Sequence, residues 1–406
     1  MGSEWRWGLA VLVLSLTTVT GVSLARAGEQ ELTTDQQREA ELLRVVGPAF
    51  TLKRTPHFLV AFDTSRALVD DLTSRLELTY QAVHRFCKVI SFDPKLTTDR
   101  LEVIFFDKQA EYDRYAAQMS FPSAGTYGFY HELTHRSAFF NVLNDPQFLA
   151  LHASVNTARA SLARLQATMD QIKDRRTPVE VEFQDGRRAR LTKGQVEREV
   201  ASARRELETL DGQRAAYCGR INQTVVQHEV AHHVLFSVGL NVRGAGNPRW
   251  LVEGLACLFE TPPDMMGSSF YAINQLRLKD FRAAVAGGAT RRQLAAEDFL
   301  TAVADGRMVP LPRLISDPAL FNARGQRAVV YYAAAWGLTH YLQRVHTAAL
   351  AGYLKAVAAR PADAEPSAQE ETELFEAHFG PLDQTFAERF SNYILKLPCH
   401  ALAGDL

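Results

Sequence analysis

The sequence has no excess of charge of either sign. It contains 45 Lys and Arg residues against 46 Asp and Glu residues, which gives a formal net charge of −1 at pH 7. The two signs are also mixed along the chain, so a basic surface that would bind nucleic acid or an anionic membrane is not expected. The apolar fraction of 47% in 406 residues is enough for a sizeable core, which argues against general disorder.

Cysteine is scarce as well. The four cysteines are Cys87, Cys218, Cys257 and Cys399. Their spacing fits no zinc motif. In an oxidising compartment they could form two disulfides, in any of three connectivities. Buried free thiols are the alternative, because a chain of this length does not need disulfides to fold.

Long apolar runs are absent except near the N-terminus. Arg6 precedes an apolar run from Leu9 to Val19, and Ala25-Arg26-Ala27 has the small-x-small pattern of a cleavage site. These features predict a signal peptide over residues 1–27 and a secreted or periplasmic mature chain. A membrane anchor is the alternative, but the run is short for about 30 Å of hydrocarbon. We therefore expect no stable membrane insertion after cleavage.

The mature chain is expected to begin with a mixed α/β region, residues 28–150. Branched and aromatic residues predict strands over His57–Asp63 and Leu101–Phe106. Between them, Ala67–Ile90 has the apolar period of a helix. The alternation of aromatic and polar residues over Gly125–Val142 indicates a β-hairpin.

Residues 151–211 are expected to form a helical hairpin inserted into this region. Apolar residues from Leu151 to Ile172 recur at alternating spacings of four and three, and the same spacing returns from Val196 to Leu210. Such heptad seams are typical of paired helices. Asp185-Gly186 between them is a typical hairpin turn. We interpret the hairpin as a spacer or as a docking surface for a protein partner.

One pattern is chemically informative: the His-Glu-x-x-His (HExxH) formed by His228, Glu229 and His232. It lies in a predicted helix over Asn222–Val238, which is expected to end near Gly239. Helix positions four apart share a face, so both histidines can direct a ring nitrogen to one metal ion. Glu229 lies close enough to contact a water at that metal without being a ligand. Zinc prefers two imidazoles and a carboxylate, with the fourth position left to water.

The same pattern also occurs earlier in the chain, from His131 to His135, so that this copy is the first HExxH and the copy from His228 to His232 is the second. Its next glutamate is Glu180, which lies far away in the predicted hairpin insertion. The aromatic residues around it favour a strand, in which the two histidines would be about 13 Å apart. We therefore interpret this copy as part of a β-hairpin and as a coincidence.

Twenty residues separate His232 from Glu253, which lies in the segment Trp250-Leu251-Val252-Glu253-Gly254-Leu255-Ala256. A helical HExxH, a loop and a W-L-x-E-G-x-A helix resemble the gluzincin zinc metallopeptidases, especially the peptidase-MA-like group and related secreted bacterial proteins. The resemblance implies that Glu253 is the third zinc ligand, and a gap of roughly 18 to 20 residues is typical of such enzymes. The two ligand helices fall within residues 212–290.

The resemblance also implies a fold and a catalytic tyrosine. The expected fold is α+β, with a zincin-like core, the helical-hairpin insertion and a mostly helical C-terminal region over residues 291–406. A tyrosine on a later helix would stabilise the charged oxygen of the tetrahedral intermediate. Tyr332 is the best match and Tyr331 the alternate, while packing in the core is the structural alternative for both.

The implied function is that of a secreted, Zn²⁺-dependent metallopeptidase that hydrolyses peptides or proteins. The metal would activate a water molecule, and Glu229 would act as general base. Two other functions stay open from the sequence. One is a catalytically silent binding or scaffold protein on the same fold, and the other is a metal-dependent amidohydrolase that is not a peptidase.

Three neighbouring polar residues are expected to be accessory. His233 projects roughly 100° away from His232, so it is expected beside the ligands or at the surface rather than as a ligand. Glu260 lies on a similar helix face to Glu253, where it would either orient a ligand histidine or occupy the surface. His340 is expected to be packed or solvated.

Overall fold

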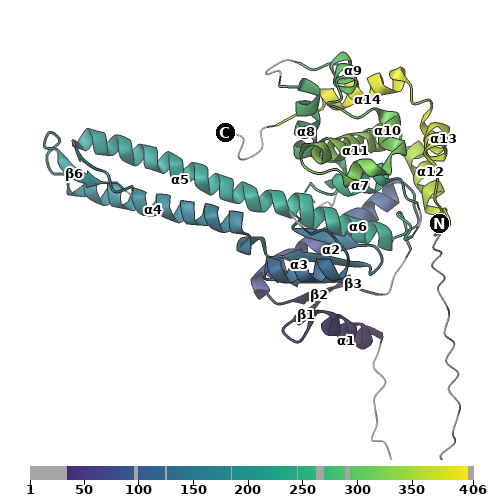
Figure 1. The fold of residues 1–406 in the computed structure, drawn as a ribbon, viewed down its shortest axis with the longest axis horizontal. Helices are drawn as coiled ribbons and strands as arrows, with labels where there is room; N and C mark the ends of the chain where they lie inside the picture. The colour runs from purple at the N-terminus through teal and green to yellow at the C-terminus, as the bar shows by residue number, and fades with distance from the viewer. Residues whose placement is uncertain are drawn as a thin grey trace, which may run out of the picture.

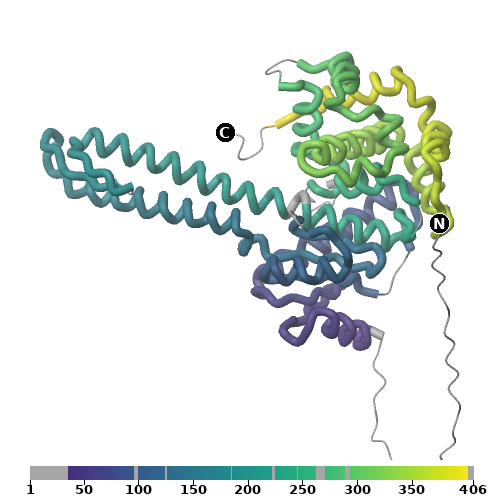
Figure 2. The backbone as a smooth tube through the Cα atoms, in the orientation of Figure 1, coloured from purple at the N-terminus to yellow at the C-terminus, as the bar shows by residue number. Residues whose placement is uncertain are grey.

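The structure, a computed structural model, describes residues 34–95, 99–123, 126–183, 185–244, 246–261, 269–288 and 293–400. The predicted signal peptide and its cleavage site lie outside these ranges. The described part is an α+β fold, as expected, in which a long helical arm projects from a compact body (Figures 1 and 2). Among the described helices, none has the length and apolar character needed to span a bilayer.

A mixed five-stranded sheet forms one half of the body, with the strand order β1-β2-β3-β5-β4. β2 and β5 run parallel to β3, and the edge strands β1 and β4 are antiparallel to their neighbours. Both predicted strands and the predicted hairpin are present. The strands are β1 Thr51–Arg54, β2 Phe58–Phe62, β3 Leu101–Phe106, β4 Gly128–His131 and β5 Arg136–Phe140.

Helices cover both faces of this sheet, which explains why β2 and β3 are buried along their whole length. Alternate strand residues point to opposite faces. Leu59 and Ile104 pack with α1 and α3, whereas Val60 and Val103 pack with α2 and α6. The helix bounds are α1 Thr34–Val46, α2 Arg66–Val89, α3 Gln109–Gln118 and α6 His228–Ser237.

The arm consists of two antiparallel helices with a β-hairpin at the tip, as predicted (Figure 1). Asp145 caps its first helix by accepting hydrogen bonds from two backbone N–H groups, and Pro146 occupies the first helical position. The heptad residues Val155 and Val196 are fully buried. The elements are α4 Pro146–Gln171, β6 Val179–Glu182, β7 Arg188–Leu191 and α5 Lys193–Ile221.

The second arm helix continues directly into the helix of the second HExxH. α5 ends at Ile221, Asn222–Gln227 form a π-helical turn, and α6 begins at His228. The helix expected over Asn222–Val238 is therefore partly π-helical, and π turns are frequent at functional sites. It ends as predicted, because Gly239 adopts a φ of 81° just beyond it.

Deleting residues 152–210 and joining the ends with a short Gly/Ser bridge should leave a folded protein that still binds zinc. The tip of the arm has its own small hydrophobic cluster, separate from the two clusters of the body. Outside the deleted residues, the hydrogen bond from the Tyr217 hydroxyl to Asp145 (2.7 Å) would still connect the two arm helices where they join the body. Thermal melting and zinc analysis test this expectation. Loss of all zinc binding in a folded product would show that the arm belongs to the core.

The rest of the chain is mostly helical, as expected, and shares one hydrophobic core with α2 and α6. α7 packs so closely on α11 that a Cβ at Gly254 would lie only 2.7 Å from the carbonyl oxygen of Ala335. The lack of a side chain at Gly254 therefore permits the close contact between α7 and α11. The elements are α7 Arg249–Leu258, η3 Ser269–Tyr271, α8 Gln275–Ala286, α9 Ala296–Ala304, α10 Leu311–Ser316, η4 Pro318–Asn322, α11 Gln326–Val345, α12 Thr347–Ala358, α13 Ala368–Phe379 and α14 Gln384–Lys396.

Candidate metal centre

Three buried side chains from α6 and α7 converge at the predicted metal site. His228 Nε2 lies 3.0 Å from His232 Nε2 and 3.2 Å from Glu253 Oε2. His232 Nε2 lies 3.3 Å from the same carboxylate oxygen. Ligand atoms about 2.0–2.1 Å from a tetrahedral zinc are about 3.3 Å from one another. The three atoms are therefore already spaced to hold one zinc ion.

The first residue of α7 fixes the orientation of the Glu253 carboxylate. Arg249 Nη2 donates a hydrogen bond of 2.8 Å to Glu253 Oε1, which leaves Oε2 directed at the two histidines. Arg249 was not singled out from the sequence. Its i,i+4 spacing to Glu253 is the signal that could have identified it.

The first HExxH forms the predicted hairpin, but its two histidines are not separated along one strand as expected: they flank the turn, and the N–H of His135 donates to the carbonyl oxygen of His131 at 2.8 Å. His131 ends β4, His135 lies in the turn with a φ of 55°, and β5 begins at Arg136. The Tyr130 hydroxyl is 2.8 Å from His135 Nδ1. Neither histidine belongs to a group of three ligands among the residues that the structure describes.

Glu229 is directed from α6 toward the edge strand of the sheet. Its Oε2 accepts a hydrogen bond of 2.9 Å from the backbone N–H of Tyr130 in β4. Burial raises the pKa of Glu229, and the neighbouring His228 and His232 oppose this shift. A carboxylate whose pKa is raised toward neutral pH is suited to act as a general base.

Tyr332, not Tyr331, lies beside the three candidate ligands. Its ring centre is 5.8 Å from that of His228 and 5.7 Å from that of Phe321. The negative charge of Glu253, followed by burial, raises the pKa of the Tyr332 hydroxyl, so it stays protonated and able to donate a hydrogen bond. Both tyrosines also pack against the hydrophobic core, the structural alternative expected for them, but of the two only Tyr332 lines the cavities at the candidate ligands.

Two cavities meet at these residues, and both are lined by His228, Glu229 and Tyr332. The first, here called the aromatic cavity, has a volume of about 180 Å³. The second, here called the α8 cavity, has a volume of about 420 Å³. The remaining lining of the aromatic cavity is Phe121, Phe129, Tyr130, Glu132, His232, Phe236, Arg249, Val252 and Glu253. The remaining lining of the α8 cavity is Arg220, Leu276, Arg277, Asp280, Ala328 and Val329.

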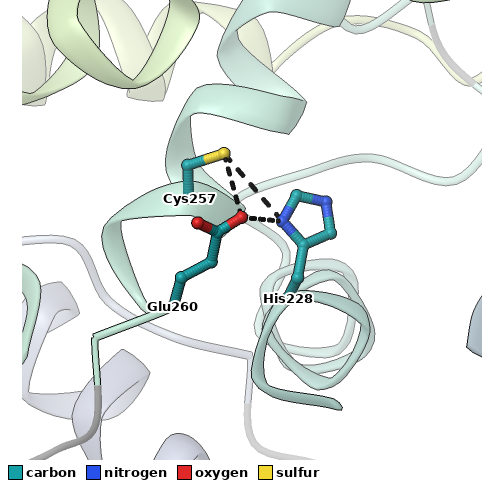
Figure 3. A group of neighbouring side chains, drawn as sticks. All are labelled: His228, Cys257 and Glu260. Carbon is teal, nitrogen blue, oxygen red and sulfur yellow. Dashed lines mark hydrogen bonds and ion pairs between the residues drawn. The ribbon is translucent and has the colours of Figure 1, made fainter. Parts of the chain in front are cut away.

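A second group of polar side chains lies behind His228 (Figure 3). His228 Nδ1 is 3.0 Å from Glu260 Oε1, and the thiol of Cys257 donates to the same oxygen at 3.4 Å. Glu260 therefore lies where it can orient a ligand histidine, the first of the two alternatives expected for it. Arg277 and Asn274, which the sequence did not reveal, also donate to its carboxylate.

This second group is poorly suited to hold a metal of its own. The guanidinium of Arg277 already balances the charge of Glu260 and, against the effect of burial, lowers its pKa to about 2. Burial raises the pKa of the Cys257 thiol to about 11, so a metal bound here would first have to displace the thiol proton. All four cysteines are free in the structure, and Cys87 and Cys257 are buried.

The two accessory histidines lie away from the candidate ligands. His233 is fully buried, with Nδ1 3.0 Å from the Ser137 hydroxyl on β5. His340 is also buried, with Nδ1 3.1 Å from the Tyr393 hydroxyl. Both are packing residues: His233 is not among the candidate ligands, as the helix geometry indicated, but it lies in the core and not at the surface.

A family model described as "Protein of unknown function (DUF1570)" matches residues 222–363. The matched region contains all three candidate ligands, Glu229 and Tyr332, and it begins at the end of the arm. Searches of curated proteins and of solved structures give no significant match.

Proposed function

We propose that this protein is a gluzincin-like zinc metallopeptidase with a zincin-like core, acting on peptides or proteins outside the cytoplasm. The observation that carries the proposal is the convergence of His228, His232 and Glu253 at mutual distances of 3.0 to 3.3 Å. These residues would hold Zn²⁺, which would supply Lewis-acid polarisation and an activated water at neutral pH. The predicted signal peptide supports the extracytoplasmic location.

The surrounding side chains support amide hydrolysis as the proposed reaction. Glu229, held by the N–H of Tyr130, takes a proton from the attacking water and passes it to the leaving amine. The Tyr332 hydroxyl donates a hydrogen bond to the substrate oxygen as negative charge develops on it. Both cavities are lined by Glu229 and Tyr332, so we infer that they take up the parts of the peptide that flank the scissile bond.

Digestion of a peptide library tests the proposed activity. The purified mature protein should cleave internal bonds, including those of peptides with blocked ends, and a chelator should abolish cleavage until Zn²⁺ is restored. A zinc-loaded protein that cleaves no peptide would contradict the proposal and favour the binding or scaffold function. Hydrolysis restricted to non-peptide amides would favour the amidohydrolase function instead.

The raised pKa of Glu229 predicts the pH dependence of kcat/KM. The base works only as a carboxylate, so activity is present above its pKa and is lost as the pH falls through it. Because burial raises this pKa above the ordinary 4.5, the acid limb should lie above pH 4.5. Zinc content measured at each pH separates protonation of Glu229 from loss of the metal. An acid limb below pH 4.5 at full zinc occupancy would contradict this assignment.

A further inference from the structure

Arg277, on α8, contacts two residues of the proposed site, Glu260 and Tyr332. Its guanidinium donates from Nε to Glu260 Oε2 (2.9 Å) and from Nη2 to Glu260 Oε1 (2.5 Å). The same guanidinium carbon lies 5.3 Å from the centre of the Tyr332 ring. The Arg277 side chain is only 11% exposed, so these contacts are shielded from water.

We propose that Arg277 is a positioning residue that holds the metal-ligand histidine His228 and the oxyanion-stabilising Tyr332 in a fixed relation to each other. The proposal rests on the proposed function. An arginine suits this task because its planar fork binds a carboxylate with two donors while its face stacks on an aromatic ring. A lysine offers one charged point in place of this plane.

The first connection runs through Glu260 to His228. When His228 Nδ1–H donates to Glu260 Oε1, the lone pair of Nε2 is left for the metal. Arg277 fixes both oxygens of that carboxylate and balances its buried charge. Without Arg277 the carboxylate would have to move or take up a proton, because an unpaired buried charge is costly. The His228 ring would then lose its fixed orientation.

The second connection is the direct contact with Tyr332. The Tyr332 ring is also contacted by Phe321 and His228, so Arg277 completes its surroundings on the side of the α8 cavity. A cation over an aromatic face attracts the ring, and the effect is larger where water is excluded. Removing the guanidinium would let the ring shift and would misplace the hydroxyl.

The test compares Arg277→Gln with Arg360→Gln, a matched control in the same chain. Arg360 forms a bidentate pair with Glu371 at 2.7 and 2.9 Å, and its side chain is equally buried at 11% exposure. No contact links Arg360 to the ligands or to Tyr332 in the part of the chain that the structure describes. Both variants should lower the melting temperature, because each breaks a buried ion pair.

Only Arg277→Gln should affect the site. Its zinc affinity, measured by competition with a chelator, should fall about 10- to 100-fold. At saturating zinc its kcat should also fall, with KM little changed. This loss of kcat should largely disappear in a Tyr332→Phe background, where no hydroxyl remains to be misplaced. Arg277→Lys, which keeps the charge, should fold more stably than Arg277→Gln without recovering wild-type zinc affinity.

Three outcomes would overturn the proposal. The first is a zinc affinity and kcat of Arg277→Gln equal to those of Arg360→Gln. The second is an equal loss of kcat with and without the Tyr332 hydroxyl. The third is full wild-type behaviour of Arg277→Lys, which also decides the matter if Arg277→Gln does not fold. If the wild-type protein binds zinc but cleaves no peptide, the proposed function fails, while the zinc-affinity comparison still tests the connection through Glu260.

Discussion

Replacing Glu229 by glutamine is expected to leave zinc bound while removing most of the peptidase activity. The three candidate ligands are untouched, and the glutamine carbonyl can still accept the hydrogen bond from the N–H of Tyr130. What is lost is the group that takes the proton from water. A positioned general base typically contributes about 10² to 10⁴-fold to the rate, so kcat should fall by that factor.

The chain supplies a matched control for this substitution. Glu132 is the glutamate of the first HExxH and lines the same aromatic cavity, but its carboxylate accepts a hydrogen bond from the N–H of Gly244 (2.7 Å). Glu132→Gln removes an equal charge from this cavity and should retain most activity. Elemental zinc analysis and peptide cleavage are measured on both variants. Equal losses in the two variants, or retained activity in Glu229→Gln, would exclude Glu229 as the base.

The strands and the ligand pair could be predicted because their signals are local. β2 and β3 are covered on both faces, so their sequences are apolar throughout except for Glu102 in β3. The i,i+4 spacing of His228 and His232 fixes their common face as soon as the segment is helical. The position of Glu253 beside the histidines depends on the contact between two helices, which no local pattern predicts. Glu253 was therefore identified only through the resemblance to known enzymes.

The residues that support the site were harder to predict because they come from distant parts of the chain. Arg277 and Asn274 lie on or beside α8, and no short spacing links them to Glu260. The choice between Tyr331 and Tyr332 depends on the rotation of α11 about its axis. Both faces of that helix carry apolar residues, so the sequence pattern did not fix this rotation. β1 was missed because it is short and only partly buried.

Removing a ligand from the second HExxH should strip the protein of zinc, whereas removing a histidine from the first should not. His232→Ala and Glu253→Ala each leave two of the three converging ligand atoms, and two protein ligands hold zinc poorly. His135→Ala is the matched control. It removes a histidine from the same five-residue pattern, but one that lies in a β-turn and contacts Tyr130.

The outcome depends on geometry rather than on the pattern itself. In α6 the two ligand nitrogens are 3.0 Å apart, and the carboxylate of Glu253 completes the set. In the hairpin, His131 pairs its ring with Thr134, and His135 pairs with Tyr130. Zinc per protein should therefore fall sharply in His232→Ala and Glu253→Ala and stay near the wild-type value in His135→Ala. Melting curves of the metal-free proteins separate loss of ligation from misfolding. Zinc lost from His135→Ala but kept by His232→Ala would place the metal at the hairpin, and the proposed mechanism would fail with it.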